Sequence, residues 1–468
     1  VASATAAAYD VANSCRFNDG DSPKLNINFG SDGTLNKWTF SMWFKRSTLG
    51  TAQRLFCVLD TGMDDYIKFG TDDQLEWTFD NEDGTNKGVL KTNRKFRDVG
   101  AFYHLVCRLD TTDSTAGDRM RMYINGTEET SFATDTNPTV NETGDIGRDN
   151  NHYIGTSGSS QYFDGYIAEV CMINNQSLAP TSFGEFDSDS PTIWKPIDVS
   201  GLTAGTNGFY LDFEDSANLG NDAFGGTDWT ETNLDATDQA TDTPTNNFAV
   251  CNSLDNFSTG GTFSEANLQT QSTTSNRGIF TATHGVSSGV WYWEIKTSAT
   301  GGTNSGDQWN YIGIAGQVGA SNTDNILGSS GTNSRKSHEY ALQAVNGSLY
   351  NNGDAAVAYG ASFTEGDIVG IKLDLDNNRI YFSKNGQWAD GSGNFDESDP
   401  SGYISIAAAS TTESGFYFPA WGDGGVNVNK TWQLNFGGSS GFSISSANQD
   451  PNGYGNFEYD TKSGYAIC

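Results

Sequence analysis

The stretch GDIVGIKLDLDNNRIYFSKNG, residues 366–386, decides how the C-terminal half of this chain folds. Apolar side chains alternate with polar residues or glycine along both halves of the stretch, which is the two-residue period of a half-buried strand. These apolar residues are Val369, Ile371, Leu373, Leu375, Ile380 and Phe382. Asp376-Asn377-Asn378 lies between the halves, and Asx side chains favour turns because they tolerate positive φ. Asn385-Gly386 supplies a second tight turn, so the stretch predicts a β-hairpin.

The composition extends this prediction to the whole chain. Glycine is abundant at 55 of 468 residues, proline is scarce at 9, and aromatic residues make up 12% of the chain. Such a chain is typical of many short strands joined by turns, and no long stretch shows a sustained helical period. Its length exceeds one ordinary domain and suits two or three. We therefore expect an all-β protein with more than one domain.

The hairpin is one of several ordered motifs in the C-terminal half. GVWYWEIK at residues 289–296 and YIGIAG at 311–316 precede it, while FPA at 418–420 and LNFG at 434–437 follow it. This ordered set, over roughly residues 275–440, resembles the SPRY domain. The resemblance implies a β-sandwich that binds partners through loops at one end and has no catalytic residues.

A second ordered set of motifs occupies the N-terminal half. It is similar to the laminin G-like, concanavalin A-like jelly roll over about residues 13–183. The matching segments are Phe17 with residues 19–21, then 40–45, 102–110, 123–126, 154–155 and 163–178. Together the two resemblances predict two antiparallel β-sandwich (jelly-roll) domains in tandem.

The domain boundaries follow from these two sets. We expect the first jelly roll at residues 1–185, the SPRY-like sandwich at 249–443, and a turn-rich C-terminal tail at 444–468. Residues 186–248 form an acidic connector. Within this connector Phe209, Leu211 and Phe213 alternate, which predicts a strand, and isolated strands are unstable. We expect that strand to complete the first sandwich.

Charge and hydropathy exclude several classes of partner. The formal net charge is −32, with 38 acidic and 17 basic residues in 1–250 and 20 acidic and 9 basic residues in 251–468. Both halves are therefore acidic and repel phosphate backbones and anionic lipid, so we expect no nucleic-acid partner. No apolar run is long enough to span a bilayer, so we expect no membrane insertion.

The six cysteines show no CxxC pairing. Cys107 shares one alternating strand face with Leu105 and Leu109, which favours a buried free thiol over a disulfide or a catalytic role. We expect most of the cysteines to be free. That state indicates folding in a reducing compartment, even for a protein that later works outside a cell.

Catalysis is not indicated by any constellation of residues. Glycoside hydrolysis usually needs two carboxylates held at a fixed separation on rigid strands. The nearest acidic pattern, residues 185–189, runs into Ser190-Pro191 and reads as a loop. The four histidines are dispersed along the chain. We expect no enzymatic activity and no catalytic residue.

Two kinds of candidate site remain. An exposed tryptophan ring suits the apolar face of a sugar, and Trp77, Trp388 and Trp421 lie near turns, although a structural role is the alternative for each. Asp19 and Asp21 lie in an Asp/Gly turn that offers oxygen ligands to Ca²⁺, the one cofactor we consider, although a solvated turn is the alternative.

The pairing of the two sandwiches, together with phrases such as SCRFNDGDS and NGFYLDFEDSA, resembles virion proteins of bacteriophages that infect aquatic bacteria. The resemblance implies a non-catalytic virion surface protein, a tail fibre or appendage adhesin that binds host or environmental glycans through sandwich loops. The expected partners are other virion proteins, further copies of the chain on the particle, and cell-surface glycan. The expected location is the virion, assembled in the host cytoplasm and extracellular after release. A structural capsid-decoration or fibre subunit, or a secreted bacterial surface adhesin, are the alternatives.

Overall fold

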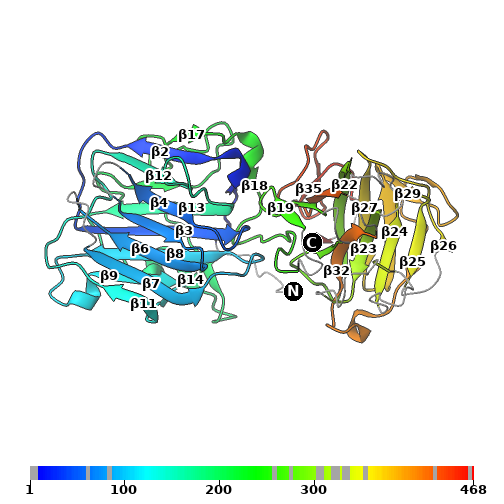
Figure 1. Ribbon diagram of the computed structural model, residues 1–468, viewed down its shortest axis with the longest axis horizontal. Helices are drawn as coiled ribbons and strands as arrows, with labels where there is room; N and C mark the ends of the chain where they lie inside the picture. Colours follow the sequence, from blue (N-terminus) through cyan, green and yellow to red (C-terminus); the bar gives the residue numbers. More distant parts are fainter. Residues whose placement is uncertain are drawn as a thin grey trace. The chain divides into compact units, whose positions relative to one another are not determined.

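The computed structural model describes residues 9–59, 64–81, 87–255, 261–272, 278–301, 310–317, 327–328, 338–351, 357–424, 429–461 and 466–467. The chain divides into two compact units, Val1–Asn247 (unit 1) and Phe248–Cys468 (unit 2). Each is built from sheets whose strand pairs are antiparallel, apart from the short parallel pair of β22 and β36, and the helical elements among the described residues are short 3₁₀ turns (Figure 1). The all-β class and the tandem of two sandwiches are confirmed.

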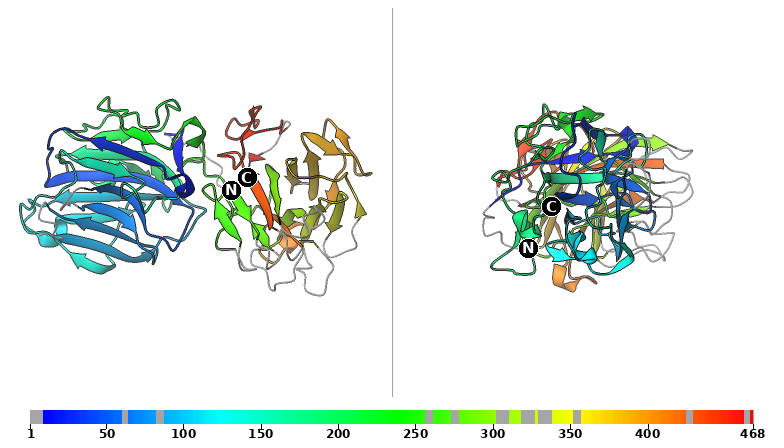
Figure 2. Two further views of the ribbon diagram at one scale, coloured as in Figure 1. Left: turned by 45° about the horizontal axis from the view of Figure 1, so that its top comes forward. Right: turned by 90° about the vertical axis from the view of Figure 1, so that its left-hand side faces the viewer.

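Unit 1 contains two eight-stranded sheets that lie face to face (Figure 2). Sheet A has the order β10-β9-β8-β3-β13-β1-β18, with β16 beside β13, and sheet B has the order β11-β7-β6-β5-β4-β12-β2-β17. The strands of sheet A are β1 (Ser14–Phe17), β3 (Lys37–Arg46), β8 (Tyr103–Asp110), β9 (Met120–Ile124), β10 (Thr127–Glu128), β13 (Gly165–Asn174), β16 (Phe209–Leu211) and β18 (Gln239–Ala240). Those of sheet B are β2 (Lys24–Asn28), β4 (Gln53–Val58), β5 (Tyr66–Phe69), β6 (Gln74–Phe79), β7 (Gly88–Lys95), β11 (Phe132–Thr136), β12 (Asn151–Ile154) and β17 (Thr230–Thr232).

The core of unit 1 fills the space between the sheets. Alternate side chains of each strand point inward, and large aromatic residues from both sheets meet there. Phe40 of sheet A stacks on Phe56 of sheet B with ring centroids 4.7 Å apart, and Trp38 lies 5.5 Å from Trp77. Aromatic packing therefore compensates for the low overall share of apolar residues.

The segment that follows β13 covers the outer face of sheet A. The strand expected near Phe209 is β16, and it pairs with β13 in antiparallel register. Phe183, Val199 and Tyr210 pack against Cys171 and other apolar residues on that outer face. This segment is thus a third layer of unit 1 rather than a free connector.

A hairpin in this layer is fastened through one buried histidine. The hairpin is formed by β14 (Gly184–Phe186) and β15 (Trp194–Pro196). The Trp194 Nε1–H donates to His104 Nδ1 over 2.8 Å, and the Trp43 ring stacks on the imidazole at 4.6 Å. Because Nδ1 accepts, Nε2 carries the proton and donates to Ser41 Oγ at 2.8 Å. Burial lowers the pKa of His104 to about 3.

The His104 imidazole makes unit 1 sensitive to acid. Below pH 6.5 the His104 imidazole is protonated in the unfolded chain, whereas in the folded chain it stays neutral until the pH approaches 3. The free energy of unfolding therefore falls as the pH falls through this window. We expect the unfolding free energy of the wild type, relative to His104→Gln, to drop by about 4 kcal/mol between pH 7 and pH 3. Urea unfolding of both proteins across this range measures it, and parallel pH curves would contradict the prediction.

Unit 2 contains a ten-stranded sheet C and a six-stranded sheet D. Sheet C has the order β19-β20-β33-β22-β27-β28-β29-β30, with β31 paired to β28 and β36 paired to β22. Sheet D has the order β21-β32-β23-β24-β25-β26. Sheet C consists of β19 (Thr262–Ser264), β20 (Gln269–Gln271), β22 (Val290–Gly301), β27 (Ile368–Asp374), β28 (Arg379–Lys384), β29 (Gln387–Ala389), β30 (Phe395–Glu397), β31 (Ile404–Ser405), β33 (Asn429–Asn435) and β36 (Ala466–Ile467). Sheet D consists of β21 (Ile279–Thr281), β23 (Asn310–Ala315), β24 (Glu339–Gln343), β25 (Ser348–Asn351), β26 (Val357–Ala358) and β32 (Phe418–Asp423).

The hairpin predicted at residues 366–386 is present at the centre of sheet C. Its strands are β27 and β28, paired from Val369↔Lys384 to Asp374↔Arg379. Asn378 and Asn385 both have positive φ, as the turn chemistry requires. This prediction is confirmed.

The described residues after 443 contain short strands. Residues after 443 form a small two-stranded sheet of β34 (Asn448–Gln449) and β35 (Asn456–Phe457), and β36 then pairs in parallel with β22 of sheet C. The scarcity of strand period in this stretch reflects very short strands. The segment is part of unit 2.

The five cysteines in the described part of the chain, Cys15, Cys57, Cys107, Cys171 and Cys251, are free and buried. The prediction of free thiols is confirmed for these five, and Cys468 lies outside the described residues. Burial raises the pKa of the Cys57 thiol to about 12, which keeps it protonated and unreactive at neutral pH. Within the described residues no helix is long and apolar enough to span a membrane.

Candidate functional site

The three tryptophans predicted to stack on sugar are buried. Trp77 and Trp421 are 0% exposed and Trp388 is 2% exposed. Trp421 donates its Nε1–H to Thr270 Oγ1 at 2.7 Å, and Trp388 lies 6.2 Å from the Tyr292 ring. A ring enclosed by protein has no face left for a sugar, so this prediction is corrected. Proximity to a turn says nothing about which side of a strand a ring faces.

Asp19 and Asp21 lie on an exposed 3₁₀ turn, η1 (Asp19–Asp21). The Asn18 Nδ2–H donates to Asp21 Oδ2 at 2.7 Å, which already engages that carboxylate. Ca²⁺ takes about six to eight oxygen ligands. Among the residues that the structure describes, no group of three or more His, Cys, Asp or Glu is placed to hold a metal ion. The two aspartates do not fit a calcium site by themselves and do not enter the function proposed below.

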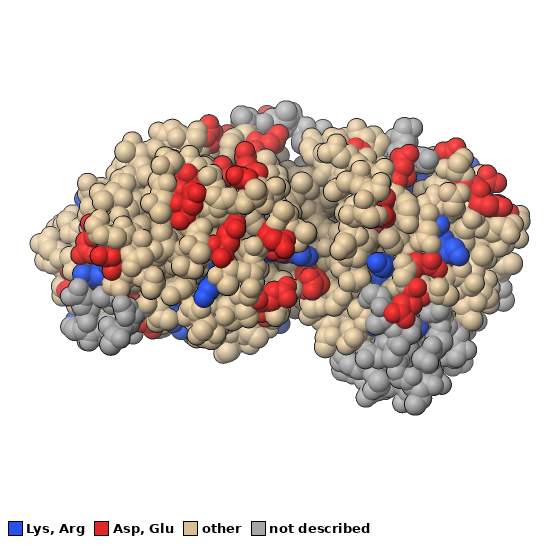
Figure 3. Space-filling view, turned by 90° about the horizontal axis from the view of Figure 1, so that it is seen from above, with Lys and Arg blue, Asp and Glu red and all other residues tan. Residues whose placement is uncertain are grey.

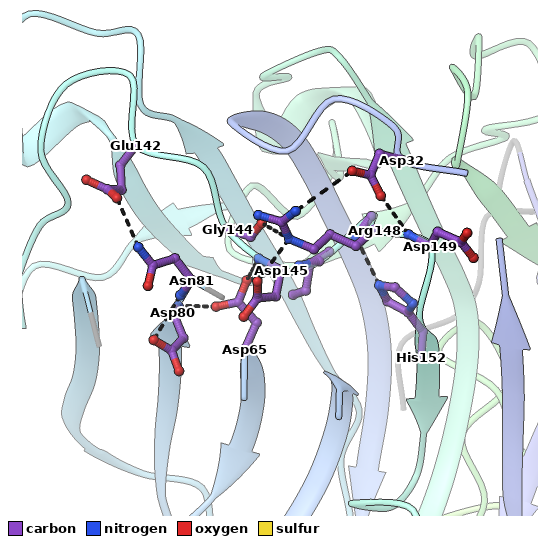
Figure 4. Close-up of polar contacts among 12 residues, drawn as sticks. Asp32, Asp65, Asp80, Asn81, Glu142, Gly144, Asp145, Arg148, Asp149 and His152 are labelled. Atoms are coloured by element: carbon purple, nitrogen blue, oxygen red, sulfur yellow. Dashed lines mark hydrogen bonds and ion pairs between the residues drawn. The ribbon is translucent and has the colours of Figure 1, made fainter. Parts of the chain in front are cut away.

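Polar side chains hold together the loops at one end of unit 1. We call this group, Asp65, Asp145, Arg148 and His152, the rim cluster (Figure 4). Asp65 at its centre is fully buried. Its Oδ2 accepts the N–H groups of Asp145 at 2.8 Å and Ile146 at 3.0 Å, and its Oδ1 accepts the N–H of Asp80. Burial raises the pKa of Asp65 to about 8, against the opposing effect of these three donors. One side chain thus joins the start of β5, the end of β6 and the loop before β12.

Arg148 and His152 complete the rim cluster. Arg148 Nε donates to Gly144 O at 3.2 Å and to Asp145 Oδ1 at 3.0 Å. The Gly147 N–H donates to His152 Nε2 at 2.9 Å, so the imidazole is neutral and its Nδ1–H donates to Asn150 O. Burial lowers the pKa of His152 to about 4. Inward hydrogen bonds therefore hold these loops in one conformation.

A row of charged residues crosses the outer face of sheet B. The strand register places Arg54 (β4) opposite Lys68 (β5), Lys68 opposite Glu76 (β6), and Glu76 opposite Lys91 (β7). We call these four residues the charged row. The Lys68 and Lys91 side chains are 21% and 25% exposed. Like charges directly opposite each other, as at Arg54 and Lys68, ordinarily destabilise a sheet.

A tyrosine and a set of ion pairs hold the charged row in place. The Arg54 guanidinium lies 4.0 Å and the Lys68 Nζ 4.2 Å from the Tyr66 ring centroid, so the ring faces two cations. The Tyr66 hydroxyl donates to Glu76 Oε1 at 2.6 Å. Lys68 lies 3.4 Å and Lys91 lies 3.9 Å from Glu76 carboxylate oxygens.

Aspartates bind the two ends of the row. Arg54 pairs with Asp64 at 2.8 Å, and Lys91 pairs with Asp72 at 2.7 Å. Lys91 lowers the pKa of Asp72. The row thus offers fixed hydrogen-bond donors and acceptors on rigid strands, directly beside the rim cluster through Asp65 and Tyr66.

Reasoning from sequence did not find the charged row. Each member occupies the polar position of an alternating strand, where a charged side chain is ordinarily just solvated. Only the register of four strands brings them into line, and register cannot be read from one strand at a time. In unit 2, residues 302–309, 318–326 and 329–337 lie outside the described residues.

Comparison with known proteins bears on both units. Residues 19–180 match the family model of the concanavalin A-like lectin/glucanases superfamily, and residues 290–420 match the model of the SPRY domain. A search of curated proteins gave no match. The chain carries a concanavalin A-like domain followed by a SPRY domain, as the sequence motifs predicted. Both resemble non-catalytic binding modules.

Solved structures with similar folds are distant. The SPRY domain of human HERC1 is 18% identical, covers 36% of this chain and 87% of its own, and has a TM-score of 0.26. The SAP-like pentraxin of Limulus polyphemus is 16% identical over 37% of this chain and 80% of its own, with a TM-score of 0.28. The Ruminococcus gnavus sialidase CBM40 bound to α2,3-sialyllactose is 14% identical over 34% and 94%, with a TM-score of 0.24. We draw no functional conclusion from likenesses this distant.

Proposed function

We propose that the protein is a non-catalytic glycan-binding protein, and that unit 1 binds an acidic glycan on the outer face of sheet B. The observation that supports this most is the charged row, in which the partly exposed Lys68 and Lys91 flank Glu76 and the buried Arg54 lies beside Lys68. A chain with a net charge of −32 has few cations to place, and acidic side chains outnumber basic ones on the face shown in Figure 3. Cations aligned on one face match a ligand that carries carboxylate or sulfate groups.

The row suits the chemistry of a sugar. Lysine and arginine donate hydrogen bonds and glutamate accepts them. The row therefore offers hydrogen bonds to several hydroxyl groups of a sugar at once. Its side chains are already held by Tyr66 and by one another, which lowers the entropy lost on binding. A sheet face is shallow and buries little of a hydrated ligand, so we expect weak binding per site and strong avidity from many copies.

The buried carboxyl groups support binding without catalysis. A general acid for glycoside hydrolysis has a raised pKa and must reach the substrate. Among the carboxyl groups with raised pKa values, Asp65, Glu169 and Glu294 are 0%, 6% and 0% exposed, and Asp19 lies on the exposed turn η1 rather than on a strand. On the charged row, Lys91 lowers the pKa of Asp72 instead.

We further propose that this glycan-binding protein is displayed on a bacteriophage virion as a tail-fibre or appendage adhesin, assembled with other virion proteins and further copies of itself. The support is the resemblance of its sequence phrases to such virion proteins. A capsid-decoration or fibre subunit without a ligand is the second candidate. It is favoured by the same resemblance, because two rigid sandwiches serve assembly equally well.

A glycan array tests the binding function. The protein, made multivalent on beads, is expected to bind uronate-containing or sulfated oligosaccharides above neutral ones of the same length, because of the cations of the charged row. Binding should weaken as salt rises, since partly exposed charges are screened. An array without binding, together with particles that fail to assemble when the protein is removed, would favour the structural subunit.

A further inference from the structure

The C-terminal residues 445–459, which we call the C-terminal clasp, lie on the outer face of sheet C. Phe457 of β35 is fully buried there and packs edge-on against Tyr292 with ring centroids 5.0 Å apart. Tyr381 and Trp388 complete the same apolar cluster. An aromatic pocket on the sheet is thus filled by a side chain that arrives from outside the sandwich. Trp388 and Phe457 both pack against the Tyr292 ring.

A buried glutamate binds the backbone of the clasp. Glu294 Oε1 accepts the Tyr459 N–H at 2.9 Å and the Tyr292 hydroxyl at 3.1 Å. Its Oε2 accepts the Glu458 N–H at 3.0 Å and the Asn435 Nδ2–H at 3.1 Å. Two consecutive backbone N–H groups are therefore captured beside the aromatic pocket, which is how a peptide is recognised.

Two glycines shape the surface for the clasp. A Cβ at Gly437 would lie 3.1 Å from the Phe457 ring, and a Cβ at Gly386 would lie 2.7 Å from the Tyr459 ring. Both glycines have positive φ, of 109° and 81°. The two rings therefore rest on backbone that has no side chain in the way.

The clasp also holds its own shape. Its loop is ordered by Asp450, whose carboxylate accepts the N–H groups of Asn452 at 2.9 Å, Tyr454 at 2.7 Å and Gly455 at 2.6 Å. Asn448 Nδ2 donates to Glu458 O at 2.8 Å, and Glu458 in turn accepts from Ser445. Donor and acceptor of each of these hydrogen bonds belong to the clasp, so the bonds are kept when the clasp leaves the sheet.

The link from the sandwich to the clasp is short and exposed. On the sandwich side the Gly441 N–H donates to Leu434 O at 2.8 Å, and the ring of the buried Phe442 lies 5.7 Å from Lys296 Nζ. Ser443 and Ser445 are exposed, and Ile444 between them is half-buried. A self-contained element that docks through an exposed link makes the same contacts when it comes from another copy of the chain, which is the physical basis of domain swapping.

We propose that the aromatic pocket and Glu294 form a docking site for the C-terminal clasp of a second copy of this chain, so that clasps exchanged between copies join the protein into assemblies. In a single chain the site is filled by its own clasp. In an assembly the same contacts are made between neighbours, and the pairing of β36, which follows the clasp in the chain, with β22 is then made between neighbours as well.

Two complementary variants test the proposal. Phe457→Ala keeps the docking site and disables the clasp. Glu294→Gln keeps the clasp and sets an amide N–H of the site against one of the two backbone N–H groups that the clasp donates. Mixed at equal concentration, they are expected to form a two-chain species that contains one of each, seen by native mass spectrometry. The double variant F457A/E294Q, which lacks both parts, should form no such species with either partner. A mixture in which both variants are folded and no mixed species forms would overturn the proposal.

A second measurement applies where either variant fails to fold. A protease site inserted after Ser443 allows the clasp of the folded full chain to be cut free of the sandwich. A labelled peptide of residues 444–468 should then replace the resident clasp at one peptide per chain, and the same peptide with Phe457→Ala should not. Failure of the wild-type peptide to enter the cut protein would show that the clasp is a permanent part of unit 2.

Discussion

Replacing Lys45 by methionine is expected to lower the unfolding free energy of unit 1 by about 3–5 kcal/mol. Lys45 and Asp242 form a buried ion pair with Nζ and Oδ2 2.8 Å apart and side chains only 1% and 2% exposed. Lys45 Nζ also donates to Asn247 Oδ1 at 2.8 Å. Removing the ammonium group leaves the Asp242 carboxylate buried beside an apolar side chain. Hydrogen exchange during urea unfolding, read on peptides of unit 1, measures the loss.

Two further variants test whether the unpaired buried charge causes the loss of stability in K45M. The double substitution K45M/D242L should recover most of the loss, because a buried pair replaced on both sides leaves no charge behind. Lys37→Met is the matched control, since Lys37 pairs with Asp110 at 2.9 Å but is 31% exposed, and it should cost no more than about 1 kcal/mol. Equal losses for K45M and K37M would contradict the explanation.

Asp65→Ala is expected to destabilise unit 1 by about 3–5 kcal/mol, because three buried backbone N–H groups lose their acceptor together. The rim cluster should loosen as a unit. The amides of Asp80, Asp145 and Ile146 are therefore expected to exchange much faster than in the wild type. Chemical unfolding and hydrogen exchange of the variant provide both readouts.

The neighbouring Asp64 is the control for Asp65. Its carboxylate is 46% exposed and pairs with Arg54, so Asp64→Ala should cost no more than about 1 kcal/mol. The amides held by Asp65 should exchange in this variant as they do in the wild type. If the two substitutions have the same effect on these amides, Asp65 does not organise the rim cluster.

Local sequence signals predicted local structure well. The hairpin β27–β28 follows from alternation and Asx turns that all lie within residues 366–386, and the strand at Phe209 shows its alternation within a few residues. The order of motifs along each half was enough to predict the two families of sandwich, because each motif is a strand with its turn.

Contacts between distant segments could not be predicted in this way. Trp388 looked available from its place beside a turn, yet it is 2% exposed and belongs to an apolar cluster that includes Phe457, far along the chain. The charged row exists only in the register of four strands, although each of its residues is visible as an ordinary polar position. Alternation identifies the faces of a strand, but it does not say what lies on them.

The binding of an acidic oligosaccharide to charged-row variants tests the proposed function most directly. K68A/K91A removes two cations that are 21% and 25% exposed, so the fold should survive, while K37A removes a comparable lysine from sheet A. With the best ligand from the array, measured on multivalent protein, we predict that K68A/K91A weakens binding at least roughly tenfold, equivalent to about 1.4 kcal/mol, and that K37A binds like the wild type. Undiminished binding by folded K68A/K91A would contradict a glycan site on the charged row.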